Sequence, residues 1–394
     1  MVQSDANKPS VCFICSPGLG ILDNWMPVLC ELRKQTPDAE FICIMPKASI
    51  AELIDLENIL IKISEDVFDK IIFRSFSGMW LQVNTFADAR KINTLTPSYK
   101  SLFMLAQRVS RFSLLSVFPK SIFKLFKYLD FKKYSHVNVK IKDICRSIGV
   151  VLYDVYEESK DYNCELLKAL KGVPKYSICH GININQDPIV RLVAKKRAKG
   201  EVKAYLFSEY EKDYYKGAFS LSADDLKVVG IPRHDKNWVD RVTNTPTAVE
   251  VKNYFWKDYI LIISRSLSPY FPRDRKKKAL KDIKRLAFEE LNLKIVVKLH
   301  PKERDDGLFE AVLGTETYGV RWVYSNAHPY LLGRKCTFAV TFYSGVATDM
   351  IALGVPVIEY LDLRGLQDYD NSESLRDVHG EPVLSLRHLG IVLG

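Results

Sequence analysis

The sequence lacks an apolar stretch long enough to cross a membrane. A spanning helix needs about 20 consecutive apolar residues, and polar or charged residues interrupt every apolar run of this chain well before that length. The first residues, Met1–Ser10, are polar and contain no apolar signal core. We therefore expect a cytoplasmic protein, whose only membrane contact would be peripheral, at the inner face of the cytoplasmic membrane.

The eight cysteines lack the spacing expected of a disulfide framework or of a zinc site. Several lie in apolar, strand-like runs such as Val11–Cys15, Phe41–Met45 and Tyr176–Cys179, which is typical of buried thiols in a reducing compartment. Cys12 and Cys15 form a single CxxC pair, but an offset of three places their side chains on opposite faces of a strand. Because no second pair accompanies them, we expect neither a disulfide framework nor a zinc site.

Acidic residues are scarce between Lys100 and Lys142. This stretch has one acid, Asp130, against ten basic residues, which is a local charge of +9 in a chain of net charge +10. Phe and Leu recur at largely helical spacing, which predicts a basic amphipathic region suited to an anionic membrane surface or a lipid-linked acceptor. A helical insertion with its apolar face on the core explains the pattern equally well. No recognised binding module accompanies the charge, so nucleic acid is not an expected partner.

The length of the chain and the alternation of strand-like and helical runs predict an α/β protein of two domains. A chain of 394 residues exceeds the usual size of one core, and apolar strand-like runs alternate with helical ones, as in parallel sheets joined by crossover helices. The run Thr243–Thr247 has turn chemistry. We therefore expect a Rossmann-like domain over residues 1–245, with the basic helical insertion at about 97–145, and a second over 246–394, with parallel sheets facing each other across a cleft. The expected strands are Val11–Cys15, Phe41–Met45, Gly149–Tyr153, Tyr176–Cys179, Ala204–Phe207, Lys227–Val229, Tyr259–Ile263, Leu293–Leu299, Val320–Tyr324, Thr337–Phe342 and Val355–Tyr360.

Polar residues follow the expected strands of the second half, where ligands bind in open α/β sheets. Lys298-Leu299-His300-Pro301 closes one strand, and an imidazole there can hold a phosphate and stabilise a departing nucleotide. Ser344-Gly345 precedes an expected helix over Val346–Leu353, whose free N–H groups can bind phosphate. Each has a plainer explanation, since a strand-end histidine is often structural and serine often caps a helix. Together they predict that the second domain holds an activated nucleotide donor.

These segments resemble the motifs of a known group of enzymes. Lys-Leu-His-Pro at 298–301, followed by residues 342–349 and by Gly354–Ile358, looks like the HP and serine motifs of bacterial GT-B transferases. That group includes polysialyltransferases, retaining β-Kdo transferases of the WbbB and KpsC type, and teichoic-acid glycerophosphotransferases. The resemblance implies a GT-B-like fold and a CMP- or CDP-linked donor, and it covers most of the second half of the chain.

Two segments of the first half add to the resemblance. Tyr156-Glu157-Glu158-Ser159 is similar to an acidic motif of the sialyl- and Kdo transferases, with Ser159 in place of its glycine. Glu158 is the candidate general acid or base, although adjacent glutamates are also a common surface feature. Cys179-His180-Gly181 resembles the His-Gly of the glycerophosphotransferases, where the histidine is implied as a base. The residues after it depart from that family, so His180 could orient a substrate instead.

The segment Gly230–Asp235 looks like the Gly-x-Pro-Arg-x-Asp segment of the glycerophosphotransferases and β-Kdo transferases. Its glycine and proline shape a turn that presents Arg233 and Asp235. The β-Kdo transferases are implied to use an aspartate as covalent nucleophile, which makes Asp235 the candidate for retention by double displacement. An N-cap of the following helix is an equally good explanation of Asp235.

Further polar residues complete the expected donor site. Arg265 and Ser266 follow a strand and could grip a phosphate or the donor carboxylate, and Lys298 and Arg233 are further candidates for donor binding. Asp368-Tyr369-Asp370 spells the DxD of metal-dependent transferases, but it lies beyond the last expected strand. We therefore expect no metal and no other cofactor.

The leading hypothesis is a glycosyltransferase that moves Kdo from CMP-Kdo to a lipid-linked or oligosaccharide acceptor in bacterial surface polysaccharide synthesis, in lipopolysaccharide O-antigen or capsule. Asp235 would attack the anomeric carbon, His300 and Ser344 would hold the departing CMP, and Glu158 would handle the acceptor proton. The alternatives are a CDP-glycerol-type glycerophosphotransferase with His180 as base, an inverting CMP-sialic acid transferase, and a non-catalytic scaffold bound to the membrane surface.

Overall fold

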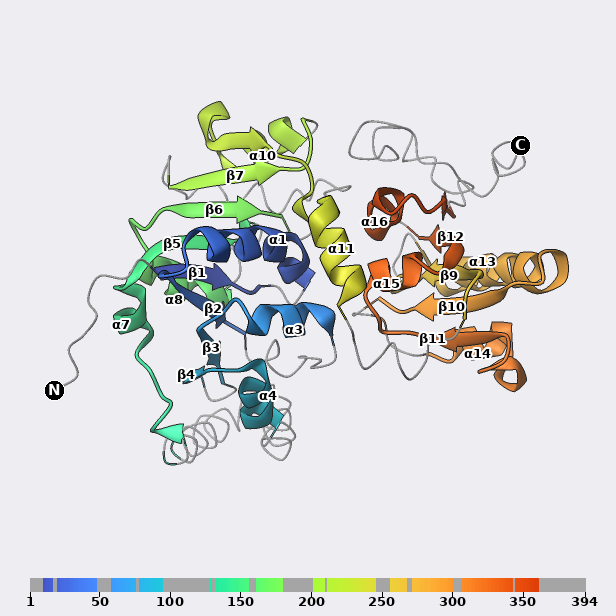
Figure 1. Cartoon of the computed structure of the whole chain (residues 1–394), viewed down its shortest axis with the longest axis horizontal. Coiled ribbons are helices and arrows are strands. Elements are labelled where there is room, and N and C mark those ends of the chain that lie inside the picture. The colour runs from blue at the N-terminus through green and yellow to red at the C-terminus, as the bar shows by residue number, and fades with distance from the viewer. Residues whose placement is uncertain are drawn as a thin grey trace, which may run out of the picture. The chain divides into compact units, whose positions relative to one another are not determined.

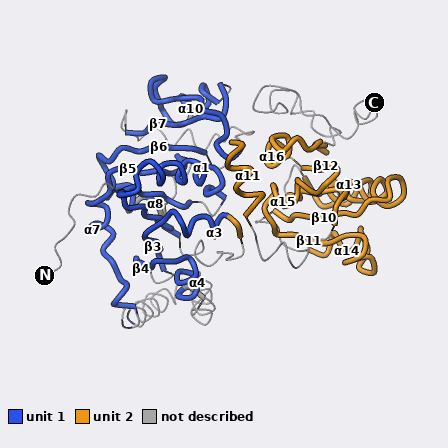
Figure 2. The backbone as a smooth tube through the Cα atoms, viewed as in Figure 1, with its two compact units in different colours: residues 1–56, 60–233 blue, residues 57–59, 234–394 orange. Residues whose placement is uncertain are grey.

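The computed structural model divides the chain into two compact units, residues 1–56 with 60–233 and residues 57–59 with 234–394 (Figure 2). It describes residues 10–16, 20–47, 58–75, 78–94, 128, 132, 134–155, 161–179, 201–209, 211–245, 256–267, 271–300, 303, 306–342 and 344–360. The units meet between Arg233 and His234, whereas the sequence predicts the boundary at residue 245. The predicted turn at Thr243–Thr247 begins at the end of helix α11 (Lys236–Asn244), which belongs to the second unit.

The sheet of unit 1 has the strand order β4-β3-β2-β1-β5-β6-β7-β8, and the strands are parallel except for the pair β3 and β4. Strand β1 (Ser10–Ile14), in the middle of the sheet, is buried along its whole length, as expected for a parallel strand covered on both faces. The strands are β1 (Ser10–Ile14), β2 (Glu40–Met45), β3 (Lys70–Arg74), β4 (Trp80–Val83), β5 (Ile148–Tyr153), β6 (Lys175–Ile178), β7 (Val202–Leu206) and β8 (Leu226–Val228).

Helices of unit 1 connect these strands, and α1 and α3 lie over one face of the sheet in Figure 1. Helix α1 buries Leu22, Trp25 and Leu29 at the spacing of one helical face. The helices are α1 (Gly20–Gln35), α3 (Ile59–Glu65), α4 (Phe86–Thr94), α7 (Ile141–Cys145), α8 (Asp161–Ala169) and α10 (Glu211–Phe219). Most of the predicted basic insertion lies outside the described residues. In the part of the chain that is described, no helix is long and apolar enough to cross a membrane.

The sheet of unit 2 is parallel, with the strand order β11-β10-β9-β12-β13. Buried side chains of its inner strands, such as Ile262 and Val297, form one core with Leu280 and Phe309 of the covering helices. The strands are β9 (Tyr259–Ile263), β10 (Lys294–Lys298), β11 (Trp322–Tyr324), β12 (Cys336–Thr341) and β13 (Val357–Glu359). The helices besides α11 are α13 (Arg273–Arg285), which continues as a π-helical turn over Leu286–Glu290, α14 (Leu308–Leu313), α15 (Pro329–Gly333) and α16 (Val346–Ala352). Two α/β units with mostly parallel sheets confirm the predicted fold class.

Candidate functional site

Three polar strand ends of unit 2 lie at one edge of its sheet. Strand β9 is hydrogen-bonded between β10 and β12, and all three run parallel, so their carboxyl ends meet at the same edge. His300 follows β10, Ser264-Arg265-Ser266 follows β9, and Ser344 follows β12. The backbone N–H of Ser264 donates to the carbonyl of Lys298 at 2.9 Å, which joins the first two ends directly. His300 and Ser344 therefore lie at the same edge of the sheet, with strand β9 between the two strands that they follow.

A buried ion pair between Lys276 of α13 and Glu303 fixes two of these loops. The two side chains are 2% and 7% exposed. The Lys276 ammonium also donates to the carbonyl of Arg265 at 3.0 Å, and the Ser264 hydroxyl donates to Glu303 Oε1 at 2.9 Å. The other carboxylate oxygen accepts from the backbone N–H of His300 at 3.2 Å. One buried pair thus holds both the segment that carries Arg265 and Ser266 and the turn that carries His300.

Lys298 holds the neighbouring loop that follows β11. Its ammonium donates to the carbonyl of Ala327 at 2.8 Å and to that of Asn326 at 3.4 Å. In the same loop, Nδ1 of His328 accepts from the backbone N–H of Tyr330 at 3.2 Å and caps α15. Lys298 therefore shapes the strand-end edge through carbonyl contacts, and its predicted contact with the donor stays a prediction.

Ser344 and Gly345 lead from β12 into helix α16. The Ser344 hydroxyl accepts from the backbone N–H of Val346 at 3.3 Å, and Gly345 is the N-cap residue. The predicted helix over Val346–Leu353 is present one residue shorter, over Val346–Ala352. Ser344 and Gly345 are both partly exposed, so they remain accessible at the same edge as His300.

Asp235 caps helix α11. Its carboxylate Oδ1 accepts from the backbone N–H groups of Asn237 at 2.9 Å and Trp238 at 3.2 Å, and the residue is exposed. The capping explanation of this residue is therefore observed. The nucleophile role predicted from the resemblance stays a prediction.

Arg233, two residues before Asp235, is buried in unit 1. Its guanidinium donates to the side-chain oxygen of Asn24 at 3.0 Å, and the Asn24 amide donates to the carbonyl of Cys179 at 2.6 Å. This chain of contacts ties the turn after β8 to helix α1 and to the residue before His180. Arg233 thus connects the turn after β8 to α1 within unit 1, and its role in donor binding stays a prediction.

Sequence reasoning assigned no role to His234 or Asp349, although both lie in the motifs that carry the resemblance. The imidazole Nε2 of His234 lies 2.8 Å from Oδ1 of Asp349 in α16. The signal that could have identified the pair is the occurrence of a histidine and an aspartate in two separate motifs, His234 next to Asp235 and Asp349 four residues after Gly345.

Several predicted residues lie outside the described residues. They are Glu157, Glu158, His180, Pro301, the Asp368–Asp370 motif and most of Lys100–Lys142. Within the described part, no group of three or more His, Cys, Asp or Glu side chains could hold a metal ion. The expectations about these residues and about cofactors stay predictions.

Four of the described thiols, those of Cys12, Cys43, Cys145 and Cys336, are poorly suited to react. Burial raises the pKa of Cys145 to about 11 and that of Cys336 to about 12. Burial also raises the pKa of Cys12 and Cys43 well above the usual range, with a smaller contribution from neighbouring cysteines. Since the thiolate is the reactive form, iodoacetamide at pH 8 should leave these four unmodified in the native protein and modify them in urea. Peptide mass spectrometry checks this, and rapid native labelling of Cys43 would contradict it.

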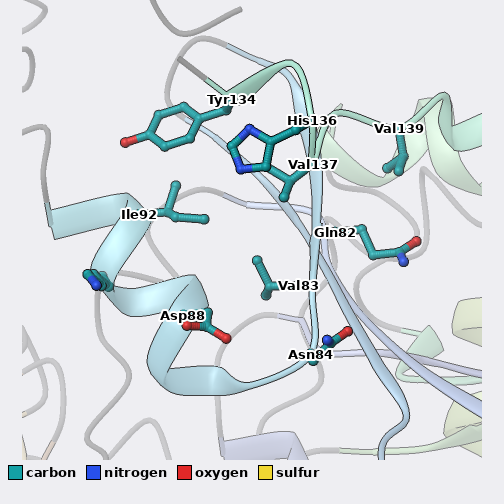
Figure 3. A pocket seen from close by; sticks show the side chains of 10 residues that line it. Gln82, Val83, Asn84, Asp88, Ile92, Tyr134, His136, Val137 and Val139 are labelled. Carbon is teal, nitrogen blue, oxygen red and sulfur yellow. The ribbon is translucent and has the colours of Figure 1, made fainter.

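Unit 1 contains a separate pocket of about 570 Å³ (Figure 3). Its lining combines apolar side chains of β4 and α4 with polar ones, among them Gln82, Asp88, Tyr134 and His136. The Thr85 hydroxyl donates to the Asp88 carboxylate at 2.8 Å at the start of α4. None of the predicted catalytic or donor-binding residues lines this pocket, although Tyr134, His136, Val137 and Val139 belong to the basic stretch Lys100–Lys142.

No protein-family model matches the chain, and no curated protein matches it. Solved structures do match. A protein from Listeria monocytogenes described as a UDP-N-acetylglucosamine 2-epimerase has a TM-score of 0.52 at 11% identity, over 92% of this chain and 82% of that one. The S. aureus MnaA-UDP co-structure has a TM-score of 0.50 at 13% identity, over 91% and 82%. The wall teichoic acid polymerase TagF has a TM-score of 0.49 at 12% identity, over 99% and 80%. The first two confirm the predicted GT-B-like fold.

Proposed function

We propose that the chain is a glycosyltransferase that binds a cytidine-nucleotide sugar, CMP-Kdo, at the strand-end edge of unit 2 and transfers Kdo to a glycan acceptor. The observation that carries the proposal is the convergence of His300, the Ser264–Ser266 segment and Ser344 at the carboxyl ends of three adjacent parallel strands. That edge is where open α/β sheets bind their ligands. UDP is bound in one of the similar structures, which is consistent with a nucleotide site in this fold.

The choice of donor rests on the motif resemblance described above. The residues around His300 and Ser344 match a group of enzymes with cytidine donors, and the acidic pair Glu157-Glu158 favours its sugar-transferring members over the glycerophosphotransferases. A donor sugar with a carboxylate also suits the basic side chain of Arg265. We further propose a lipid-linked or oligosaccharide acceptor and peripheral contact with an anionic membrane through Lys100–Lys142.

Nucleotide binding tests the site. His300→Ala should weaken CMP binding at least about tenfold, because a charge-assisted hydrogen bond to phosphate contributes about 1.5–3 kcal/mol. Titration calorimetry measures this, and the exposed His136→Ala in unit 1 is the matched control, expected to bind CMP like the unmodified chain. If the His300→Ala variant and the control bind CMP with equal affinity, the phosphate does not bind at this edge of the sheet.

Donor identity needs a second experiment. The protein is incubated in parallel with CMP-Kdo, CMP-sialic acid, CDP-glycerol and UDP-N-acetylglucosamine, each with an oligosaccharide acceptor, and nucleotide release is measured. We expect CMP release from CMP-Kdo and a β-linked product by NMR. Release from CDP-glycerol alone would make the chain a glycerophosphotransferase, and release from none of the cytidine donors would overturn the proposal.

A further inference from the structure

His234 and Asp349 form a polar pair between residues 115 apart in the sequence. Nε2 of His234 lies 2.8 Å from Oδ1 of Asp349. The Asp349 side chain is 3% exposed, whereas that of His234 is 19% exposed. A buried carboxylate therefore lies behind an imidazole whose ring still reaches solvent. Both residues belong to unit 2, His234 in the turn before α11 and Asp349 within α16.

The pair orients the imidazole ring. An ionised carboxylate only accepts hydrogen bonds, so the 2.8 Å contact with an ionised Asp349 requires the proton on Nε2 of His234. In the neutral ring, the lone pair is then on Nδ1, and no described residue is found bonded to that nitrogen. A carboxylate that fixes the tautomer and orientation of a partly exposed imidazole is the arrangement in which histidine transfers protons.

The pair lies beside the candidate donor site. Asp349 is four residues beyond Gly345, which is about one helical turn on the same face of α16. Gly345 and Ser344 form the strand end assigned above to the donor. In a double displacement, the acceptor enters from the face that the departing nucleotide has left. The base that serves the acceptor must therefore lie on the nucleotide side, and Asp349 lies on the helix that begins at the strand end proposed to hold the nucleotide.

We propose that His234 is the base that accepts the acceptor proton in the second step of transfer, with Asp349 as its positioning residue. The inference rests on the function proposed above. In the first step, Asp235 bonds to the anomeric carbon while the bond from that carbon to the CMP phosphate breaks. In the second, the acceptor O–H bond breaks, its proton goes to Nδ1 of His234, and the acceptor oxygen bonds to the anomeric carbon. The bond to Asp235 breaks and its carboxylate is restored. His234, in place of Glu158, then handles the acceptor proton.

His234→Gln tests this assignment, because glutamine can still bond to Asp349 but cannot accept the proton. Steady-state transfer should fall by on the order of 10²-fold or more, the usual contribution of a general base. The first step should survive, so mixing with CMP-Kdo should release a burst of CMP of about one equivalent. Intact-protein mass spectrometry should show the glycosyl adduct, and the Kd for CMP measured by calorimetry should stay within about twofold of that of the unmodified chain.

Asp349→Asn provides an independent variant. An amide in that position can donate to Nε2, which moves the ring proton to Nδ1 and removes the base. Transfer should fall by at least about tenfold, with the CMP burst retained. The control His136→Gln, an exposed histidine of unit 1, should transfer at the unmodified rate.

The possible results separate the two proposals. If the unmodified chain releases no CMP from any cytidine donor, the proposed function fails and this inference falls with it. If the unmodified chain transfers Kdo and His234→Gln transfers it equally fast, only the base assignment is overturned. It is also overturned if His234→Gln binds CMP normally but gives no burst, or if Glu158→Gln traps the adduct and His234→Gln does not.

Discussion

Lys276→Met should destabilise unit 2 by about 3–5 kcal/mol, the usual cost of leaving one partner of a buried ion pair without its counter-charge. Glu303 would stay buried with only the Ser264 hydroxyl and the backbone N–H of His300 as its described partners. Hydrogen–deuterium exchange of peptides from β9 and β10 measures the loss locally. Their protection should fall by on the order of 10²- to 10³-fold, and the melting temperature by on the order of 10 °C.

The matched control is Lys278→Met, the same substitution at an exposed position of the same helix. It should change the free energy of unfolding by less than about 0.5 kcal/mol. A double variant, Lys276→Met with Glu303→Leu, should be less destabilised than Lys276→Met, because no uncompensated charge is left buried. If Lys276→Met is as stable as Lys278→Met, the pair does not hold the two loops together.

Nucleotide binding should respond to the same substitution. The pair connects the carbonyl of Arg265 and the backbone of His300, so its loss releases two of the three strand ends proposed to hold the donor. CMP affinity should therefore fall in Lys276→Met although Lys276 itself is buried away from solvent. The fold would thus make CMP binding at His300 and Ser264–Ser266 depend on the buried pair of Lys276 and Glu303, which lies outside the motifs.

Most strands of both sheets were predictable from the sequence, including the edge strands β8, β11 and β13, whereas β3 and β4 were not. Strand β9 and its neighbour β10 are buried on both faces and appear as continuous apolar runs. The strands that were not predicted are β3, whose apolar centre is Ile71–Phe73, and β4, a four-residue antiparallel strand at the sheet edge. Neither length nor alternation separates such segments from a loop.

The location of His300 and Ser344 at strand ends was predictable from the sequence, but the side-chain contacts around them were not. The rule that ligands bind at the carboxyl ends of strands brought His300 and Ser344 to one edge, because it needs only the order of strands and the residues that follow them. The pairs Lys276–Glu303 and His234–Asp349 join residues 27 and 115 positions apart, so they depend on how helices pack against that edge. Likewise, α11 belongs to compact unit 2 because of its packing, which includes contacts with α15 and cannot be read from the local sequence.

Asp235→Asn should abolish transfer while leaving the protein folded. Asparagine caps a helix as well as aspartate does, so the bonds to Asn237 and Trp238 survive and the stability should change by only a few tenths of a kcal/mol. The amide cannot form the glycosyl ester, so kcat should fall by on the order of 10⁴-fold or more, as when other enzymes lose their nucleophile. Asp235→Ala should lose the cap as well, at about 1 kcal/mol.

The CMP burst separates the role of Asp235 from that of its neighbour. Asp235→Asn removes the first step, so it should release no CMP and form no adduct, while its affinity for CMP is unchanged. His234→Gln removes the second step and should stop after one equivalent of CMP. Full transfer activity in Asp235→Asn would show that the aspartate is a helix cap and no more. The retaining mechanism would then need another nucleophile, even if the donor site at His300 and Ser344 is right.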